Sequence, residues 1–317
     1  MKRPLLLASA SLALWACGGE PEFTQPLKLA GGKEISAAAL ARGKERYTLY
    51  CRACHGDLGD GRGPAGIGMR PPPRNFTEPA FKFGGVAAGE LPPDEELVRI
   101  VKGGLNGTPM LPWDVPEADL LDIIQYIKTF NVIWTEDEPG EKVVISDDPW
   151  VGKEADGVAR GKIVYHATAQ CLKCHPAYAT KQEIWDAAVI ADGEGSTRAF
   201  REGMYYPEVK FAKAYNNNLL PPDFTRHPIK SGSTPRDLFR TIASGIGGTA
   251  MPMWKDAIPD EDIWAIAHYV NSLYLIKDKP EGAELRKRML EQPDWQPPTP
   301  PDAPAPEGAT PPPAEPQ

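Results

Sequence analysis

Two copies of one short motif constrain this chain more than any other feature of its sequence. Residues 51–55 read CRACH, and residues 171–175 read CLKCH. Two thiols separated by two residues and followed at once by a histidine are typical of covalent haem c attachment, because each thiol can bond one porphyrin vinyl group and the histidine can bind the iron. With five cysteines and five histidines in the chain, two chance copies would occur in about one in a million sequences of this composition. We therefore predict two covalently attached haems, held by these residues: Cys51, Cys54, His55, Cys171, Cys174 and His175.

The fifth cysteine, Cys17, leaves no pair for a structural disulfide bond. A protein that uses its Cys-x-x-Cys pairs for thiol redox chemistry or for zinc binding is an alternative to a haem protein. The histidine that follows both pairs argues against this alternative. Haem attachment through such a motif takes place outside the cytoplasm, so we expect an exported protein.

The first residues agree with export. A basic start is followed by an apolar run, Leu5 to Ala16, that is too short to span a bilayer. The run ends in Leu-Trp-Ala-Cys, which resembles a bacterial lipoprotein signal. We expect residues 1–16 to be a signal peptide and Cys17 to be lipidated, which would anchor the chain on the periplasmic side of an inner or outer membrane. A plain secretory signal with an incidental cysteine is the alternative.

Hydrophobic periodicity predicts helices on either side of the first motif. One helix begins at the N-cap Ser36 and runs into the motif, a short helix covers residues 95–101, and a closing helix begins near Pro116. Glycine-rich and proline-rich loops separate them, and one of these loops ends at Met110.

The same order of elements returns in the second half, which indicates a duplicated module. The matching stretches are Arg-Gly-Lys at 42–44 and 160–162, Phe-Thr after a Pro-Pro stretch at 76–77 and 224–225, and Gly-Thr-x-Met at 107–110 and 248–251. We predict a tether at 17–35, a first domain at 36–132, a linker at 133–157, a second domain at 158–277 and a Pro-rich tail at 278–317 that is extended and largely disordered. The second copy also has an insert at about 176–220, interpreted as an extra loop and helix over the second haem, or else as a docking or substrate surface.

Each half resembles a class I c-type cytochrome domain. The resemblance rests on a glycine-containing helix before CxxCH, a Pro-containing loop, the Gly-Thr-x-Met stretch and a closing amphipathic helix, over residues 36–132 and 158–276. It implies an all-α fold of two tandem cytochrome c-like domains, each wrapped around a covalent haem. It also implies that the first and last helices cross at Gly43 in one domain and at Gly161 in the other.

The resemblance further implies the iron ligands. In this family the histidine of CxxCH is one axial ligand and a distant methionine is the other, so the expected metal ligands are His55 with Met110, and His175 with Met251. A soft thioether favours ferrous iron, so such a pair raises the reduction potential. The alternative methionines are Met69 in the first domain and Met253 in the second.

The second ring nitrogen of such a histidine needs a hydrogen-bond acceptor. The resemblance implies a backbone carbonyl at a Gly-Pro pair, which residues 63–64 provide in the first domain, whereas the second domain has no match and the acceptor of His175 stays open. The remaining histidines, His166, His227 and His268, are not expected to be ligands, and His268 is expected at the surface because it aligns with a glutamine.

Two haems with both axial positions filled favour one-electron transfer, and no catalytic residue is predicted. The leading hypothesis is a lipid-anchored dihaem carrier, or the cytochrome subunit of a membrane oxidoreductase, that exchanges electrons with redox proteins or a membrane respiratory complex. A dihaem enzyme, such as a peroxidase or a thiosulfate dehydrogenase, is the alternative and would need an open or labile haem. The net charge of −8 argues against a nucleic-acid partner and leaves a basic protein partner open.

Overall fold

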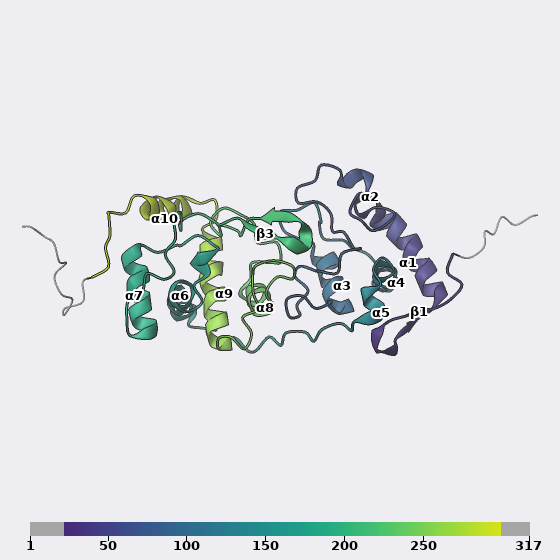
Figure 1. Cartoon of the computed structure of the whole chain (residues 1–317), viewed down its shortest axis with the longest axis horizontal. Coiled ribbons are helices and arrows are strands. Elements are labelled where there is room, and N and C mark those ends of the chain that lie inside the picture. Colours follow the sequence, from purple (N-terminus) through teal and green to yellow (C-terminus); the bar gives the residue numbers. More distant parts are fainter. Residues whose placement is uncertain (1–21, 299–317) are drawn as a thin grey trace, which may run out of the picture.

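A computed structural model describes residues 22–298 and contains two helical domains side by side along the long axis of the molecule (Figure 1). Domain 1 contains the first cysteine motif, domain 2 contains the second, and each domain has its own apolar core. Strands occur there only as two short antiparallel hairpins, so the prediction of an all-α fold in two tandem domains is confirmed. The predicted signal peptide, Cys17 and residues 299–317 of the predicted tail lie outside the described residues.

Domain 1 begins with a hairpin of β1 (Leu27–Lys28) and β2 (Glu34–Ile35). Leu29 and Ile35 are buried in the domain core, so residues 27–35, predicted as part of a tether, belong to the domain. Its helices are α1 (Ala37–Tyr50), α2 (Arg52–His55), α3 (Asp94–Gly103), α4 (Glu117–Lys128) and α5 (Ile133–Glu136). Ser36 begins α1 as predicted, because its hydroxyl accepts a hydrogen bond from the backbone N–H of Ala39 at 3.2 Å. The predicted short helix and closing helix correspond to α3 and α4.

Domain 2 repeats this order and adds elements within and after it. Its helices are α6 (Glu154–Ile163), α7 (Lys181–Asp192), α8 (Pro235–Ser244), α9 (Asp260–Leu275) and α10 (Pro280–Leu290), and its hairpin consists of β3 (Lys210–Ala212) and β4 (Asn217–Leu219). The insert at 176–220 therefore folds into α7 and the β3–β4 hairpin. Within residues 22–298, no helix combines the length and the apolar character needed to cross a bilayer.

In each domain the first helix crosses the closing helix at a glycine, as the resemblance implied. A Cβ atom at Gly43 would lie 2.2 Å from the carbonyl oxygen of Asp122 in α4, and one at Gly161 would lie 2.0 Å from that of Ala265 in α9. No larger side chain fits at either crossing without moving the helices apart. These crossings hold the helix before each cysteine motif against the core.

The segment between the domains, residues 137–152, lies against both of them and is called the strap below (Figure 1). The predicted linker at 133–157 thus contains α5, the strap and the start of α6. The backbone N–H of Val143 donates to the carbonyl of Gly85 in domain 1 at 2.8 Å. Trp150 is buried in domain 2, where its indole N–H donates to the carbonyl of Glu261 at 3.1 Å. The strap therefore connects both domains through packing as well as through the chain.

Two sequence-based predictions for the end of domain 2 are wrong. His268 is buried rather than at the surface, because its Nε2 atom forms a hydrogen bond with the carboxylate of Asp148 in the strap at 2.8 Å. The tail predicted from residue 278 begins with helix α10. Pro280 is the first residue of this helix, where a backbone N–H would have no acceptor within the helix, so proline is well accommodated. Met289 of α10 is buried, and this contact gives the helix an apolar anchor.

Candidate haem sites

Both cysteine motifs fold into the same tight turn. The backbone N–H of His55 donates to the carbonyl of Cys51, and that of His175 donates to the carbonyl of Cys171, both at 2.9 Å. The four motif cysteines form no disulfide bonds within the described residues. Burial raises the pKa of the Cys51 and Cys171 thiols to about 12. Reactive thiols of redox Cys-x-x-Cys pairs have lowered pKa values instead, so this geometry does not favour the thiol redox alternative.

Each motif histidine forms a hydrogen bond with a backbone carbonyl through Nδ1. The acceptors are the carbonyl of Arg74 for His55, at 3.0 Å, and the carbonyl of Pro222 for His175, at 3.1 Å. A carbonyl only accepts, so Nδ1 carries the proton and Nε2 keeps its lone pair for a metal. Burial lowers the pKa of both imidazoles, although these hydrogen bonds oppose the shift, and it therefore favours the neutral form that binds iron.

These acceptors correct the prediction about the Gly-Pro pair. Gly63 does not accept from His55 but packs under the motif, since its N–H donates to the carbonyl of Cys54 at 3.1 Å. The acceptor of His175, which the sequence left open, is the carbonyl of Pro222. Each acceptor lies two residues before the phenylalanine of the Phe-Thr repeat, so the two domains orient their motif histidines through equivalent backbone carbonyls.

The same phenylalanines stack on the histidine rings. Phe76 lies on His55 with ring centroids 4.6 Å apart, and Phe224 lies on His175 with centroids 4.9 Å apart, both with nearly parallel planes. A tyrosine of the preceding helix or of its extension fixes the residue after each histidine. The hydroxyl of Tyr47 donates to the carbonyl of Gly56 at 2.7 Å. That of Tyr165 donates to Pro176 at 2.9 Å. Each imidazole is therefore held in its orientation from two sides.

The two methionine loops contain equivalent hydrogen bonds. The backbone N–H of Met110 donates to the Thr108 hydroxyl oxygen at 3.1 Å, and the same hydroxyl donates to the carbonyl of Leu105 at 2.8 Å. Thr249 makes the equivalent two bonds in the loop of Met251, at 3.1 and 2.8 Å. The repeated Gly-Thr-x-Met stretch therefore encodes one loop conformation that presents a methionine in each domain.

The methionines of these loops differ from their alternatives in their surroundings. Met251 is partly buried and packs against the core of domain 2, whereas 38% of Met253 is exposed. Met110 and Met69 are both partly buried, but only Met110 lies in a loop with a counterpart in the other domain.

Domain 2 departs from domain 1 just before its motif. Two extra residues lie between Tyr165 and Cys171, and a π-helical segment, Val164–Thr168, accommodates the longer chain. It places His166 in the core, with Nδ1 2.7 Å from the carbonyl of Lys162 and Nε2 3.2 Å from the backbone N–H of Tyr178. Both ring nitrogens of His166 are thus used within the protein, which agrees with the expectation that it is no ligand.

The two domains meet through equivalent loops, so their contact has approximate two-fold symmetry. The loop before Met110 packs on the segment after Phe224: a Cβ at Gly107 would lie 2.2 Å from the side chain of Pro228. Reciprocally, a Cβ at Gly248 would lie 3.0 Å from that of Ala80, the counterpart of Pro228 in domain 1.

Hydrogen bonds also connect the two domains at these equivalent loops. The backbone N–H of Asn106 in domain 1 donates to the carbonyl of Lys230 in domain 2 at 3.0 Å. The hydroxyl of Tyr215, from the insert, lies 3.1 Å from the carbonyl of Ala80 and 2.9 Å from that of Gly247. Each methionine loop is therefore in direct contact with the other domain.

A group of cations lies at this contact. Arg74, whose carbonyl holds His55, has a guanidinium Nε that is buried and has no hydrogen-bond partner within residues 22–298. Lys82 lies over the ring of Tyr215 at 4.1 Å, and burial, together with the nearby Lys230 and Arg74, lowers the pKa of Lys82 to about 8. The guanidinium of Arg74 also donates through Nη2 to the carbonyl of Glu78, so Nε is its buried donor without a partner. Such a donor beside two lysines fits a haem carboxylate, which would supply the missing acceptor.

Comparisons with known proteins agree with this geometry. The model of the family described as cytochrome c oxidase, cbb3-type, subunit III matches residues 38–127 and 156–270, one range in each domain. A solved structure of the reducing HAO-like protein complex of Kuenenia stuttgartiensis contains a similar chain, with 28% sequence identity and a TM-score of 0.59. The similarity covers 73% of this chain and 95% of that one. No curated protein matches the chain.

Proposed function

We propose that this chain, which belongs to the cytochrome c oxidase, cbb3-type, subunit III family, carries two covalent haems and passes single electrons between them. Membership in the family makes the chain a c-type cytochrome with covalently bound haem c, whose function is haem-based electron transfer. The proposal adds that both domains are loaded. It also adds that the chain is a subunit or a docked carrier of a larger redox assembly, as the similar chain in the HAO-like complex is part of a complex.

The observation that carries the proposal is the contact between the two methionine loops and the opposite domains. Gly107 against Pro228 and Gly248 against Ala80 bring equivalent parts of the two candidate sites to one interface. If each loop supplies an iron ligand, the two haem sites lie on either side of a well-packed contact. Such an arrangement supports direct electron exchange within one chain.

The proposed iron ligands are His55 with Met110, and His175 with Met251. The histidines support this assignment, since each holds its Nδ1 proton on a carbonyl and leaves Nε2 free. The equivalent threonine bonds support the two methionines. When bound, the haems supply one-electron chemistry at a potential that the thioether ligand raises. The chain fixes the ligands, buries the imidazoles and joins the two sites.

The proposed location is the periplasmic face of a bacterial membrane, with the chain held by lipid at Cys17. The support is the sequence alone: the apolar run that ends at Cys17 resembles a lipoprotein signal. Proposed partners are redox proteins or a membrane respiratory complex. Part of the predicted tether at 17–35 packs on domain 1 instead, because Leu29 and Ile35 of the β1–β2 hairpin are buried in its core.

Intramolecular electron exchange can be measured directly. Met110→His should shift the spectrum and potential of the domain 1 haem away from those of domain 2. After partial photoreduction of this variant, we expect electrons to redistribute between the haems at a rate that does not depend on protein concentration. A rate that rises in proportion to concentration would show exchange between molecules and contradict the proposal. Met69→His is the control, and we expect it to leave both haem spectra unchanged.

A further inference from the structure

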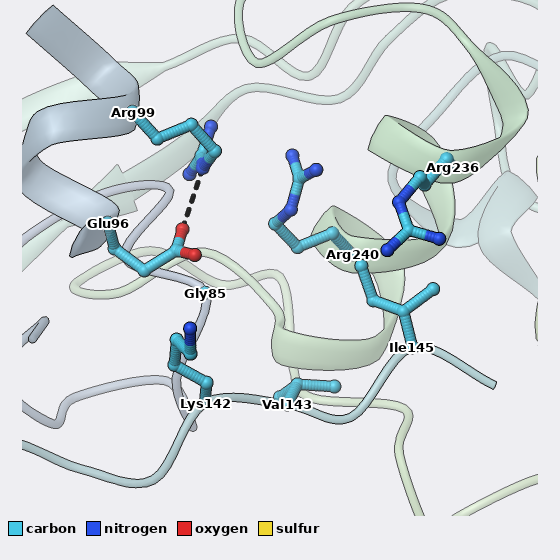
Figure 2. A pocket seen from close by; sticks show the side chains of 8 residues that line it. All are labelled: Gly85, Glu96, Arg99, Lys142, Val143, Ile145, Arg236 and Arg240. Carbon is cyan, nitrogen blue, oxygen red and sulfur yellow. Dashed lines mark hydrogen bonds and ion pairs between the residues drawn. The ribbon is translucent and has the colours of Figure 1, made fainter.

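A second cationic cluster lines a cavity of about 260 Å³ between the domains (Figure 2). Helix α3 of domain 1, helix α8 of domain 2 and the strap form its walls. Four basic side chains line it, from all three segments: Arg99 in α3, Lys142 in the strap, and Arg236 and Arg240 in α8. In Figure 2 these side chains surround a common space, with Glu96 as the carboxylate among the lining residues.

Two of the arginines are equivalent by the internal repeat, since Arg99 and Arg240 precede Met110 and Met251 by the same number of residues. Each pairs with a carboxylate one turn earlier in its own helix. Arg99 Nε lies 2.7 Å from Glu96, and Arg240 Nη1 lies 3.1 Å from Asp237. Because the pairs come from opposite domains, the cavity belongs to the same symmetric contact as the methionine loops.

The cavity has more positive charge than these two carboxylates compensate. Lys142 and Arg236 make no ion pair or side-chain hydrogen bond with any of residues 22–298, which leaves an excess of two cations. The two excess cations, Lys142 and Arg236, are exposed, whereas Arg240 on the same cavity is 13% exposed, so solvent screens the charge least on the inner wall. This local excess occurs in a chain whose net charge is −8. An anion with about two negative charges would remove it.

We propose that this cavity binds a small dianion of the phosphate class, which links domain 1 to domain 2. Guanidinium groups donate in pairs to phosphate oxygens, and three of the four cations here are arginines. The volume is below the range of about 300–1,000 Å³ that is usual for drug-sized ligands, so an inorganic phosphate or a headgroup fits better than a large molecule. The phosphate could come from solution or from a phospholipid. The haem assignments are not needed for this inference.

Binding can be tested on the haem-loaded protein by isothermal titration calorimetry. The probes are inorganic phosphate and pyrophosphate, with chloride at equal ionic strength as the reference. We expect Arg236→Gln and Arg240→Gln to weaken phosphate binding by about tenfold or more, as the loss of a charged hydrogen bond does. Arg198→Gln is the matched control, because Arg198 is an exposed arginine that does not line the cavity. Arg236 is exposed too, so its replacement should leave the fold intact.

A second arm distinguishes the source of the phosphate group. Flotation with vesicles of phosphatidic acid, compared with phosphatidylcholine vesicles, reports on headgroup binding. Saturable binding of the free ions that both cavity variants weaken supports a soluble ligand. Binding to phosphatidic acid vesicles alone, weakened by the same variants, supports a lipid headgroup. The proposal is overturned if neither probe binds, or if the control variant loses as much binding as the cavity variants.

Discussion

Replacement of Gly107 tests whether the two domains pack in solution as the structure describes. A Cβ atom there would lie 2.2 Å from Cγ of Pro228, whereas carbon atoms in contact need about 3.5–4.0 Å. The loops must therefore separate. Gly107 also has a φ of +69°, which costs an alanine about 1–2 kcal/mol. We expect the overpacking to add about 1–3 kcal/mol to this backbone cost in Gly107→Ala.

A matched variant separates the two contributions. Gly32→Ala changes a glycine of the same domain with a φ of +82° but with no atom within 4 Å of the new Cβ. Urea unfolding followed by circular dichroism should show a greater loss of stability in Gly107→Ala than in Gly32→Ala, by about 1–3 kcal/mol. Electron redistribution between the haems should also slow in Gly107→Ala alone. Equal losses of stability in the two variants would refute the domain contact.

Three further predictions concern the core and the ligands. Burial lowers the pKa of His166 to about 4. As the pH falls from about 6.5 to 4, the unfolded chain therefore binds a proton that the folded chain excludes, and about 3 kcal/mol of stability is lost. His166→Gln should flatten the pH profile of the unfolding midpoint in this window, and an unchanged profile would contradict the assignment. Met110→Leu should halve the far-red charge-transfer band of the ferric protein, whereas Met253→Leu should leave it intact. Gly161→Ala should destabilise the folded protein by about 1–3 kcal/mol in urea unfolding, despite the better helix propensity of alanine. The control, Gly103→Ala, should be neutral or stabilising, because no atom lies within 4 Å of the new Cβ. Equal effects of the two variants would exclude close packing at the helix crossing.

The sequence predicted the parts of the fold that repeat. The resemblance to class I c-type cytochromes predicted the helix crossings at Gly43 and Gly161, which the structure confirms. The haem-attachment residues follow from the chemistry of the motif and stay a prediction. These features depend on residue type, because no other side chain bonds a porphyrin vinyl group or leaves the space that a glycine leaves. The equivalent loops at Met110 and Met251 followed from the repeat for the same reason.

Features made by backbone groups were harder to predict. Every residue has a carbonyl, so nothing in the sequence marked Arg74 and Pro222 as the acceptors for the histidines. The one signal in the sequence is the phenylalanine two residues later in both copies, Phe76 and Phe224, which belongs to the repeat but does not by itself indicate a carbonyl acceptor.

The burial of His268 depends on a hydrogen-bond partner that is distant in the sequence. His268 was expected at the surface because it aligns with Gln125, but both are buried and each is bonded to an aspartate. Asp94 partners Gln125, and Asp148 in the strap partners His268. A polar residue on a closing helix is therefore no evidence of exposure when a distant carboxylate can satisfy it.

The far-red charge-transfer band of the fully oxidised protein, measured per chain, tests the central claim most directly. The account predicts the intensity of two low-spin haems with histidine and methionine ligands and no high-spin signal. Half that intensity, or a high-spin component in the wild-type chain, would contradict the claim that His55 with Met110 and His175 with Met251 hold two haems for electron transfer.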